Sequence, residues 1–170
     1  GRPLSETYIH HEGRVNLDFQ NGTVIVFSDA HFHPNVRTTS FRALITLIKQ
    51  LKPIAVICNG DAFDGGTISR YPRIGWDKKP TVAQELKAVE EYLTEIEDTS
   101  KGSKLIWCLG NHDARLSRYL AVHAPHVEKL PFTSLEDFIP SWPLSWTVRI
   151  NRNTVLRHRN QAGMLHLQAQ

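Results

Sequence analysis

The chain lacks the features of a membrane-spanning or disulfide-stabilised protein. Its 170 residues contain no apolar run near the roughly 18 residues that a membrane-spanning helix needs. They contain only two cysteines, Cys58 and Cys108, and both fall inside apolar runs, where a free cysteine behaves as a small buried hydrophobic residue. Because nothing indicates an oxidising compartment, we expect a cytoplasmic protein without a disulfide.

The chain also has little net charge. Its formal charge is +3, with 22% charged and 41% hydrophobic residues, which is ordinary for a globular protein. This excess is compatible with an anionic substrate, but it is too small to argue by itself for nucleic-acid binding. The length suits one domain with a substantial core.

What the chain does have is a polar cluster after each of three short apolar runs. The runs, at residues 24–27, 54–58 and 105–109, are rich in β-branched and aromatic residues and are typical of buried strands. Side chains that leave parallel strands at their carboxyl ends meet at one edge of the sheet, and these carboxylates, imidazoles and one amide suit divalent metal ions. The clusters are Asp29-Ala30-His31, Gly60-Asp61-Ala62-Phe63-Asp64 and Gly110-Asn111-His112-Asp113.

Helical patterns separate these runs. The apolar spacing of residues 82–96 predicts an amphipathic helix with Thr81 as its N-cap. The alternation of strands and helices predicts an α/β layered fold whose core strands pair in parallel. Two further helices and a final hairpin are expected over residues 41–51, 114–123, and 146–150 with 154–157.

The spacing of the polar residues predicts a metal site. Asp29 and His31 lie two apart, so in extended backbone they point to one face and hold one ion together. Asp61 emerges from the neighbouring strand and can bridge two ions about 3.5–4 Å apart. Asn111 and His158 follow later apolar runs and are further donors of the right kind.

Two ions held in this way are suited to phosphoester hydrolysis. They can clamp phosphate oxygens and lower the pKa of a shared water to about neutral, and the resulting hydroxide attacks phosphorus in line. We expect His112 to supply a proton to the leaving alkoxide and Asp64 to orient the His112 ring. Arg115 is a candidate for binding a phosphate oxygen.

Simpler interpretations exist for each feature taken alone. Each cluster is compatible with an ordinary turn or helix cap, and only the ordered occurrence of all three favours a metal site. His158 lies in a cationic stretch and could be a solvated strand end. The loop with Tyr71, Arg73 and Trp76 could be a substrate-facing lid or a packed surface loop.

The motif order Asp29-x-His31, Gly60-Asp61-x-x-Asp64, Gly110-Asn111-His112-Asp113 and His158 resembles the calcineurin-like metallophosphoesterase superfamily, from about residue 24 to residue 159. The longer context of residues 68–76, 110–115 and 156–159 is similar to members encoded by bacteriophages and prophages. The resemblance implies a β-sandwich flanked by helices and two divalent ions, with Mn²⁺ first and Fe, Zn or Ni as alternatives. It implies the following ligands and catalytic pair: Asp29, His31 and bridging Asp61 for one ion, Asn111 and His158 for the other, and His112 paired with Asp64 as the acid or leaving-group stabiliser.

The chain departs from the family pattern after residue 159. It has no Gly-His-x-His motif, and residues 160–170 look like an atypical tail in which His166 is a conceivable substitute ligand. We therefore expect an N-terminal arm over residues 1–20, an incomplete phosphoesterase domain over 21–159, missing C-terminal strands, and activity impaired by truncation. Two alternatives stay open, a catalytically inactive remnant and a basic nucleic-acid-binding module that uses Arg149, Arg152, Arg157 and Arg159.

Overall fold

The fold is known from a computed structural model that describes residues 13–71, 74–76, 78–128 and 130–158. Some predictions fall outside the described residues. These are the first twelve residues of the expected arm, Arg73, Arg159, and the expected tail of residues 160–170 with His166.

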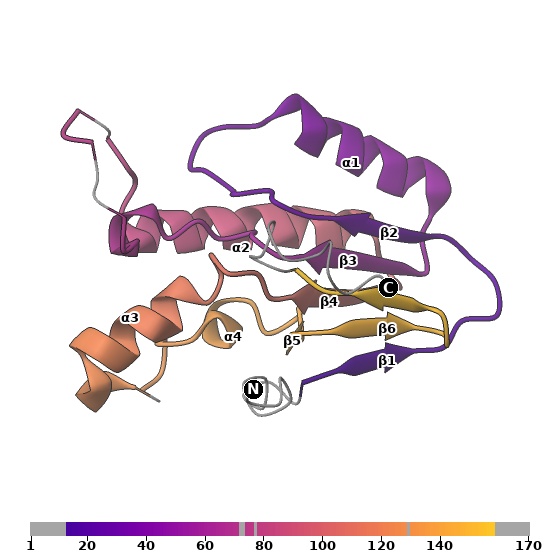
Figure 1. The fold of residues 1–170 in the computed structure, drawn as a ribbon. Helices are drawn as coiled ribbons and strands as arrows, with labels where there is room; N and C mark the ends of the chain where they lie inside the picture. Colours follow the sequence, from indigo (N-terminus) through magenta and orange to yellow (C-terminus); the bar gives the residue numbers. More distant parts are fainter. Residues whose placement is uncertain (1–12, 72–73, 77, 129, 159–170) are drawn as a thin grey trace, which may run out of the picture.

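The centre of the molecule is a four-stranded parallel sheet in the order β2-β3-β4-β5 (Figure 1). Three of its strands match the predicted apolar runs, which confirms the parallel α/β core. The fourth was not predicted, because two residues are too short to show a hydrophobic period. The strands are β2 (Val24–Phe27), β3 (Ala55–Asn59), β4 (Lys104–Cys108) and β5 (Leu144–Ser145).

A second, three-stranded sheet combines an early strand with the predicted hairpin. β6 (Val148–Ile150) and β7 (Thr154–Leu156) pair antiparallel, as expected, and β1 (Val15–Leu17) pairs in parallel with β6. The expected N-terminal arm is therefore wrong at residues 15–17, which belong to the sheet. A three-residue strand is defined by its partner rather than by its own sequence pattern.

The two sheets and the helices form layers around the central sheet. One face of this sheet packs against β1 and β6 through a small cluster that includes Leu17, Cys108 and Val148. The other face carries the larger core and is covered by α1 (Thr39–Leu51) and α2 (Val82–Thr99). Cys58 and Cys108 are both buried and free, as predicted. The architecture is the expected sandwich flanked by helices.

The helix ends follow the capping rules that the sequence suggested. Thr81 caps α2 in a full capping box with Gln84, which satisfies two backbone N–H groups at the first turn. The remaining helical elements connect the strands at the site end of the sheet. These elements are η3 (Gly66–Ile68), α3 (Arg115–His123), η4 (Pro125–Val127) and α4 (Leu135–Phe138).

In the part of the chain that the structure describes, no helix combines the length and apolar character that a membrane crossing requires.

Candidate metal centre

The loops that follow β2 and β3 run side by side and carry the first site residues. The Asp29 N–H donates to the Gly60 carbonyl and the His31 N–H to the Asp61 carbonyl, each at 2.9 Å. Asp29, His31 and Asp61 all have left-handed backbone, with φ of 53°, 39° and 57°. The expectation of extended backbone at Asp29 and His31 is therefore wrong. Non-glycine residues in this region cost on the order of 1–3 kcal/mol each, and such strain is concentrated at functional sites.

Two glycines allow the close approach of the strand ends. Gly60 has φ +89°, and a Cβ there would lie 2.3 Å from Cγ of His158. A Cβ on Gly110 would lie 2.0 Å from Oδ1 of Asp61. Both distances are far below van der Waals contact, so the packing of Asp61 and His158 requires glycine at both positions.

Asp29, Asp61 and His158 form the first group of potential metal ligands. One donor atom from each lies within 4.8 Å of the others. His158 Nε2 lies 3.1 Å from Asp61 Oδ2 and 4.0 Å from Asp29 Oδ1. The other ring nitrogen of His158 lies 2.8 Å from the Asn59 carbonyl, which can only accept a hydrogen bond. The proton of a neutral His158 therefore lies on Nδ1, and the lone pair of Nε2, on the side of Asp61, can bind a metal ion.

His31, Asp61 and His112 form a second group within the same limit. The His31 and His112 rings meet edge to face with centroids 4.7 Å apart, and His112 Nε2 lies 3.9 Å from Asp61 Oδ2. Asp61 is common to both groups and is 3% exposed. Asn111 is half-buried in the adjoining loop.

Asp64 connects the two histidines of the second group. Its Oδ1 lies 2.7 Å from His112 Nδ1 and 3.4 Å from His31 Nδ1. These hydrogen bonds, led by that from His31, hold the pKa of Asp64 far below its usual range. The same interaction raises the pKa of His31. The contact between Asp64 and His112 is the one that the sequence analysis expected.

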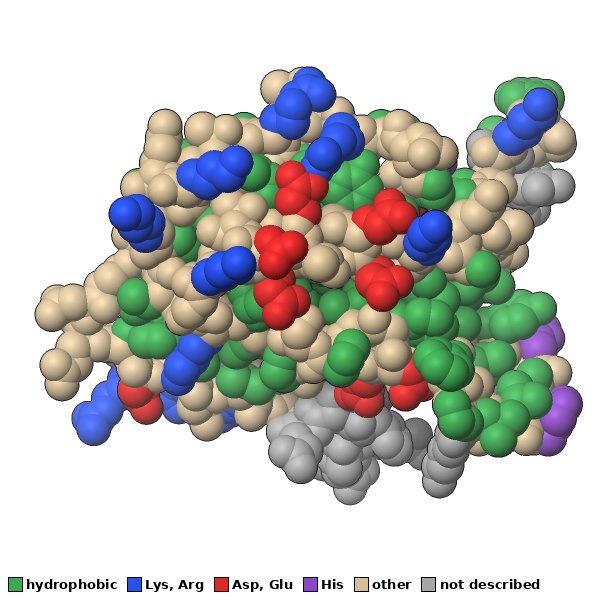
Figure 2. Space-filling view, turned by 180° about the vertical axis from the view of Figure 1, so that it is seen from behind, with side chains coloured by type: hydrophobic (Ala, Val, Ile, Leu, Met, Phe, Trp, Pro, Cys, Tyr) green, Lys and Arg blue, Asp and Glu red, His purple; other side chains and the backbone are tan. Residues whose placement is uncertain are grey.

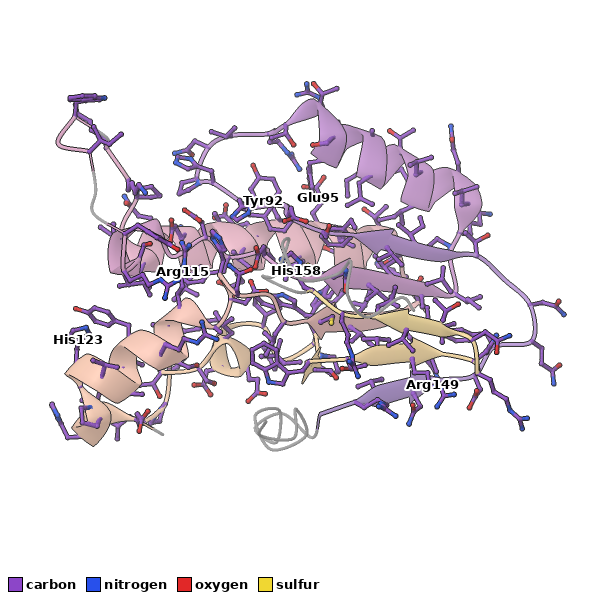
Figure 3. The ribbon with its side chains drawn as sticks, in the orientation of Figure 1. Tyr92, Glu95, Arg115, His123, Arg149 and His158 are labelled. Atoms are coloured by element: carbon purple, nitrogen blue, oxygen red, sulfur yellow. The ribbon has the colours of Figure 1, made fainter. Side chains whose placement is uncertain are left out.

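Arg115, at the start of α3, is tied to this pair (Figure 3). Its Nη1 donates to the Asp64 carbonyl at 2.7 Å, and its Nη2 lies 3.1 Å from His112 Nε2. The guanidinium is therefore fixed beside the candidate acid. Its binding of a substrate phosphate stays a prediction.

Asp113 is the functional residue that sequence reasoning missed. This carboxylate is 1% exposed and accepts four hydrogen bonds. Its Oδ2 accepts from the Trp107 indole and from two backbone N–H groups, and its Oδ1 accepts from a third backbone N–H group. Burial raises its pKa to about 6, against the effect of its backbone donors. The sequence suggested only a turn residue, because a local pattern reveals only the bond from Gly110, which lies in the same loop. The other three donors lie in strand β4 and in the loop after β3. The donors are the N–H groups of Asp61, Phe63 and Gly110 and the indole of Trp107.

Ser28 is a second missed neighbour of the site. Its hydroxyl donates to Asp29 Oδ2 at 2.6 Å and so helps to orient the most exposed carboxylate of the first group. Carboxylate oxygens and imidazole nitrogens that converge at this spacing have the donor chemistry of a divalent transition-metal centre. Such a centre can polarise a phosphoester.

Comparison with known proteins agrees with this geometry. The family model described as calcineurin-like phosphoesterase matches residues 22–165, which is most of the chain and includes every candidate site residue. No curated protein matches the chain. Metal-dependent hydrolysis of phosphoesters is the activity that the family model implies, and the two groups of ligand atoms fit it. The chain belongs to the calcineurin-like phosphoesterase family.

Proposed function

We propose that the chain hydrolyses phosphomonoesters or phosphodiesters with a dinuclear metal centre that Asp61 bridges. The observation that carries this proposal is the membership of Asp61 in both groups of ligand atoms. Asp29, His31, Asn111 and His158 are the further ligands. His112 also lies in the second group, but we assign it to proton donation and not to an ion. Mn²⁺ is the first candidate, and Fe, Zn and Ni suit the same mixture of carboxylate, imidazole and amide donors.

The bound ions would supply Lewis-acid polarisation of the phosphate and a water of lowered pKa. The protein's own contribution is orientation. His158 is held by the Asn59 carbonyl, and the Asp61 carboxylate accepts from the His112 N–H at 3.0 Å. Because these side chains are fixed before substrate arrives, little reorganisation is needed during the reaction.

His112 is the proposed proton donor to the leaving oxygen. Its Nδ1 is 2.7 Å from Asp64, whose lowered pKa keeps it an anion that stabilises a protonated imidazole. Nε2 of a neutral His112 accepts from Arg115, whereas a protonated ring would donate from Nε2 to a leaving oxygen. Arg115 then stands beside the position where negative charge develops.

The test is hydrolysis of bis(p-nitrophenyl) phosphate and p-nitrophenyl phosphate by the purified chain, with Mn²⁺ or with EDTA. We expect metal-dependent turnover that Asp61→Asn abolishes. Asp98→Asn, an exposed aspartate at the far end of α2, is the matched control and should retain turnover. No turnover from a folded chain that binds Mn²⁺ would refute the proposal and leave the inactive remnant as the better interpretation.

A further inference from the structure

The loop of residues 65–80 carries an unusual share of the chain's charge. Its sequence has four basic residues and one acidic residue, whereas the rest of the chain has sixteen of each. The entire formal excess of +3 therefore lies in this one loop. The basic residues are Arg70, Arg73, Lys78 and Lys79, and the acidic residue is Asp77.

The same loop presents large apolar side chains to solvent. Trp76 is 86% exposed, and Tyr71 and Ile74 are also exposed. The described part of this loop projects from the body of the protein beside the start of α2, and the space-filling view shows hydrophobic and basic side chains together on it (Figures 1 and 2). By contrast, Trp107 and Trp142 are buried in the core. An exposed tryptophan among cations indicates a binding surface rather than a packing role.

Both ends of the loop lie at the metal centre. At its start, the Gly65 N–H donates to buried Glu85 at 3.0 Å, directly after Asp64. Near the end of the loop, the Lys79 side chain lies beside Gly66, close to Asp64. A Cβ on Gly66 would lie 2.8 Å from Asp64 Oδ2 and 3.4 Å from Lys79 Nζ. A ligand that lies along the loop therefore reaches the candidate site without crossing other parts of the protein.

We propose that this loop binds single-stranded nucleic acid and guides it to the metal centre. Binding by the loop stands by itself, whereas hydrolysis of the bound strand rests on the proposed function. Trp76 and Tyr71 stack against unpaired bases, while Arg70 and Lys78 contact the phosphates. Arg70 already lies over the Tyr71 ring at 5.1 Å, which prepares a cationic and aromatic surface. Duplex DNA offers the phosphates but keeps its base faces covered.

Among the described residues, the arginines of the C-terminal hairpin do not form a comparable surface with the site. Arg149 lies in β6 away from Arg115 and His158 (Figure 3), and its Nη2 donates to the Arg152 carbonyl in the hairpin turn. Arg157 donates to the Thr147 hydroxyl. These side chains make local hydrogen bonds, whereas the 65–80 loop adjoins the metal centre.

The experiment measures binding without hydrolysis. A fluorescein-labelled twelve-residue oligothymidylate is titrated with the whole chain in EDTA, and anisotropy is recorded at several salt concentrations. We expect Trp76→Ala to weaken binding about tenfold, as loss of one base stack does, and Trp76→Phe to retain most of the affinity. Val122→Ala, which alters an exposed apolar residue on α3, is the matched control and should bind as the parent does.

Two further comparisons separate stacking from charge. Lys78→Gln should weaken binding and reduce its salt dependence, whereas Lys101→Gln, an exposed lysine at the other end of α2, should not. Trp76→Ala should weaken binding of the single strand but not of the corresponding duplex. Absence of oligonucleotide binding, or equal binding by the parent and Trp76→Ala, would overturn the inference even if nitrophenyl esters are hydrolysed. Trp76-dependent binding without ester hydrolysis would instead support it and refute the proposed function.

Discussion

Replacement of the buried carboxylate Asp113 gives the sharpest test of how the site is held together. Its Oδ2 accepts from Asp61 N at 2.8 Å, Gly110 N at 2.7 Å and Trp107 Nε1 at 3.1 Å, and its Oδ1 accepts from Phe63 N at 3.1 Å. The polar loops after β3 and β4 and the Trp107 indole of β4 thus meet on one side chain. Asp113→Asn keeps a single acceptor oxygen and puts an NH₂ group against at least one donor.

The magnitude follows from the number of donors left without an acceptor. In the better orientation the amide oxygen replaces Oδ2, and only the Phe63 N–H loses its partner. One buried unsatisfied donor plus the loss of charge in the other bonds gives a destabilisation of about 2–4 kcal/mol. Asp113→Ala leaves all four donors unsatisfied, at roughly 1–3 kcal/mol each, which is comparable with the whole stability of a domain.

The assay is thermal unfolding in EDTA at pH 7.5, above the raised pKa of about 6, so that the carboxylate is ionised. For a chain of this size, 2–4 kcal/mol lowers Tm by about 4–16 °C. Asp98→Asn removes an exposed carboxylate and should change Tm by little. A change in Tm of less than about 2 °C for Asp113→Asn would refute the reasoning, because it would mean that the four hydrogen bonds contribute almost nothing net.

Two further outcomes are expected. Both Gly60 and Gly102 have positive φ, so alanine at either position should cost ~1 kcal/mol in backbone strain. Only at Gly60 does the added Cβ also meet His158, at 2.3 Å, so Gly60→Ala should destabilise the protein by well over that amount. It should also weaken Mn²⁺ binding measured by calorimetry. Equal effects of the two substitutions would contradict this. The pair of Asp64 and His31 should stabilise the metal-free protein most between the unfolded pKa values of the two groups, about 4 and 6.5. Below that window, the stabilisation from the pair is lost because the Asp64 carboxylate, whose pKa is lowered in the folded protein, becomes protonated. Above that window, it is lost because the His31 imidazole, whose pKa is raised in the folded protein, loses its proton. Urea unfolding from pH 3 to 9 should therefore show the largest difference between the parent and Asp64→Asn near pH 5–6, and a difference that grows steadily with pH would exclude the ion pair.

The central sheet and its polar edge could be predicted because their signals are local. Each of β2, β3 and β4 is a continuous apolar run, and α2 has both a helical period and a capping residue, Thr81. Parallel pairing then places the residues after these strands at one edge. The contact between Asp64 and His112 was accessible by the same reasoning, although 48 residues separate them.

The weaker predictions failed where structure depends on partners. β5 has two residues and β1 has three, and both exist because a neighbouring strand completes their hydrogen bonds. The backbone at Asp29 and His31 is left-handed because hydrogen bonds to the next loop hold it there. No pattern within either segment encodes such bonds.

The sequence by itself determined the layered α/β fold, the family and the set of chemically capable residues, because these depend on hydrophobic period, strand length and motif order along the chain. Only the tertiary structure decided which donor atoms meet. It places Asp61 in both ligand groups, makes Asp113 the common acceptor of the two loops after β3 and β4, and brings Lys79 to Gly66, close to Asp64. These relations depend on distances of a few ångströms between residues far apart in sequence, and those distances are set by the packing of the strand ends.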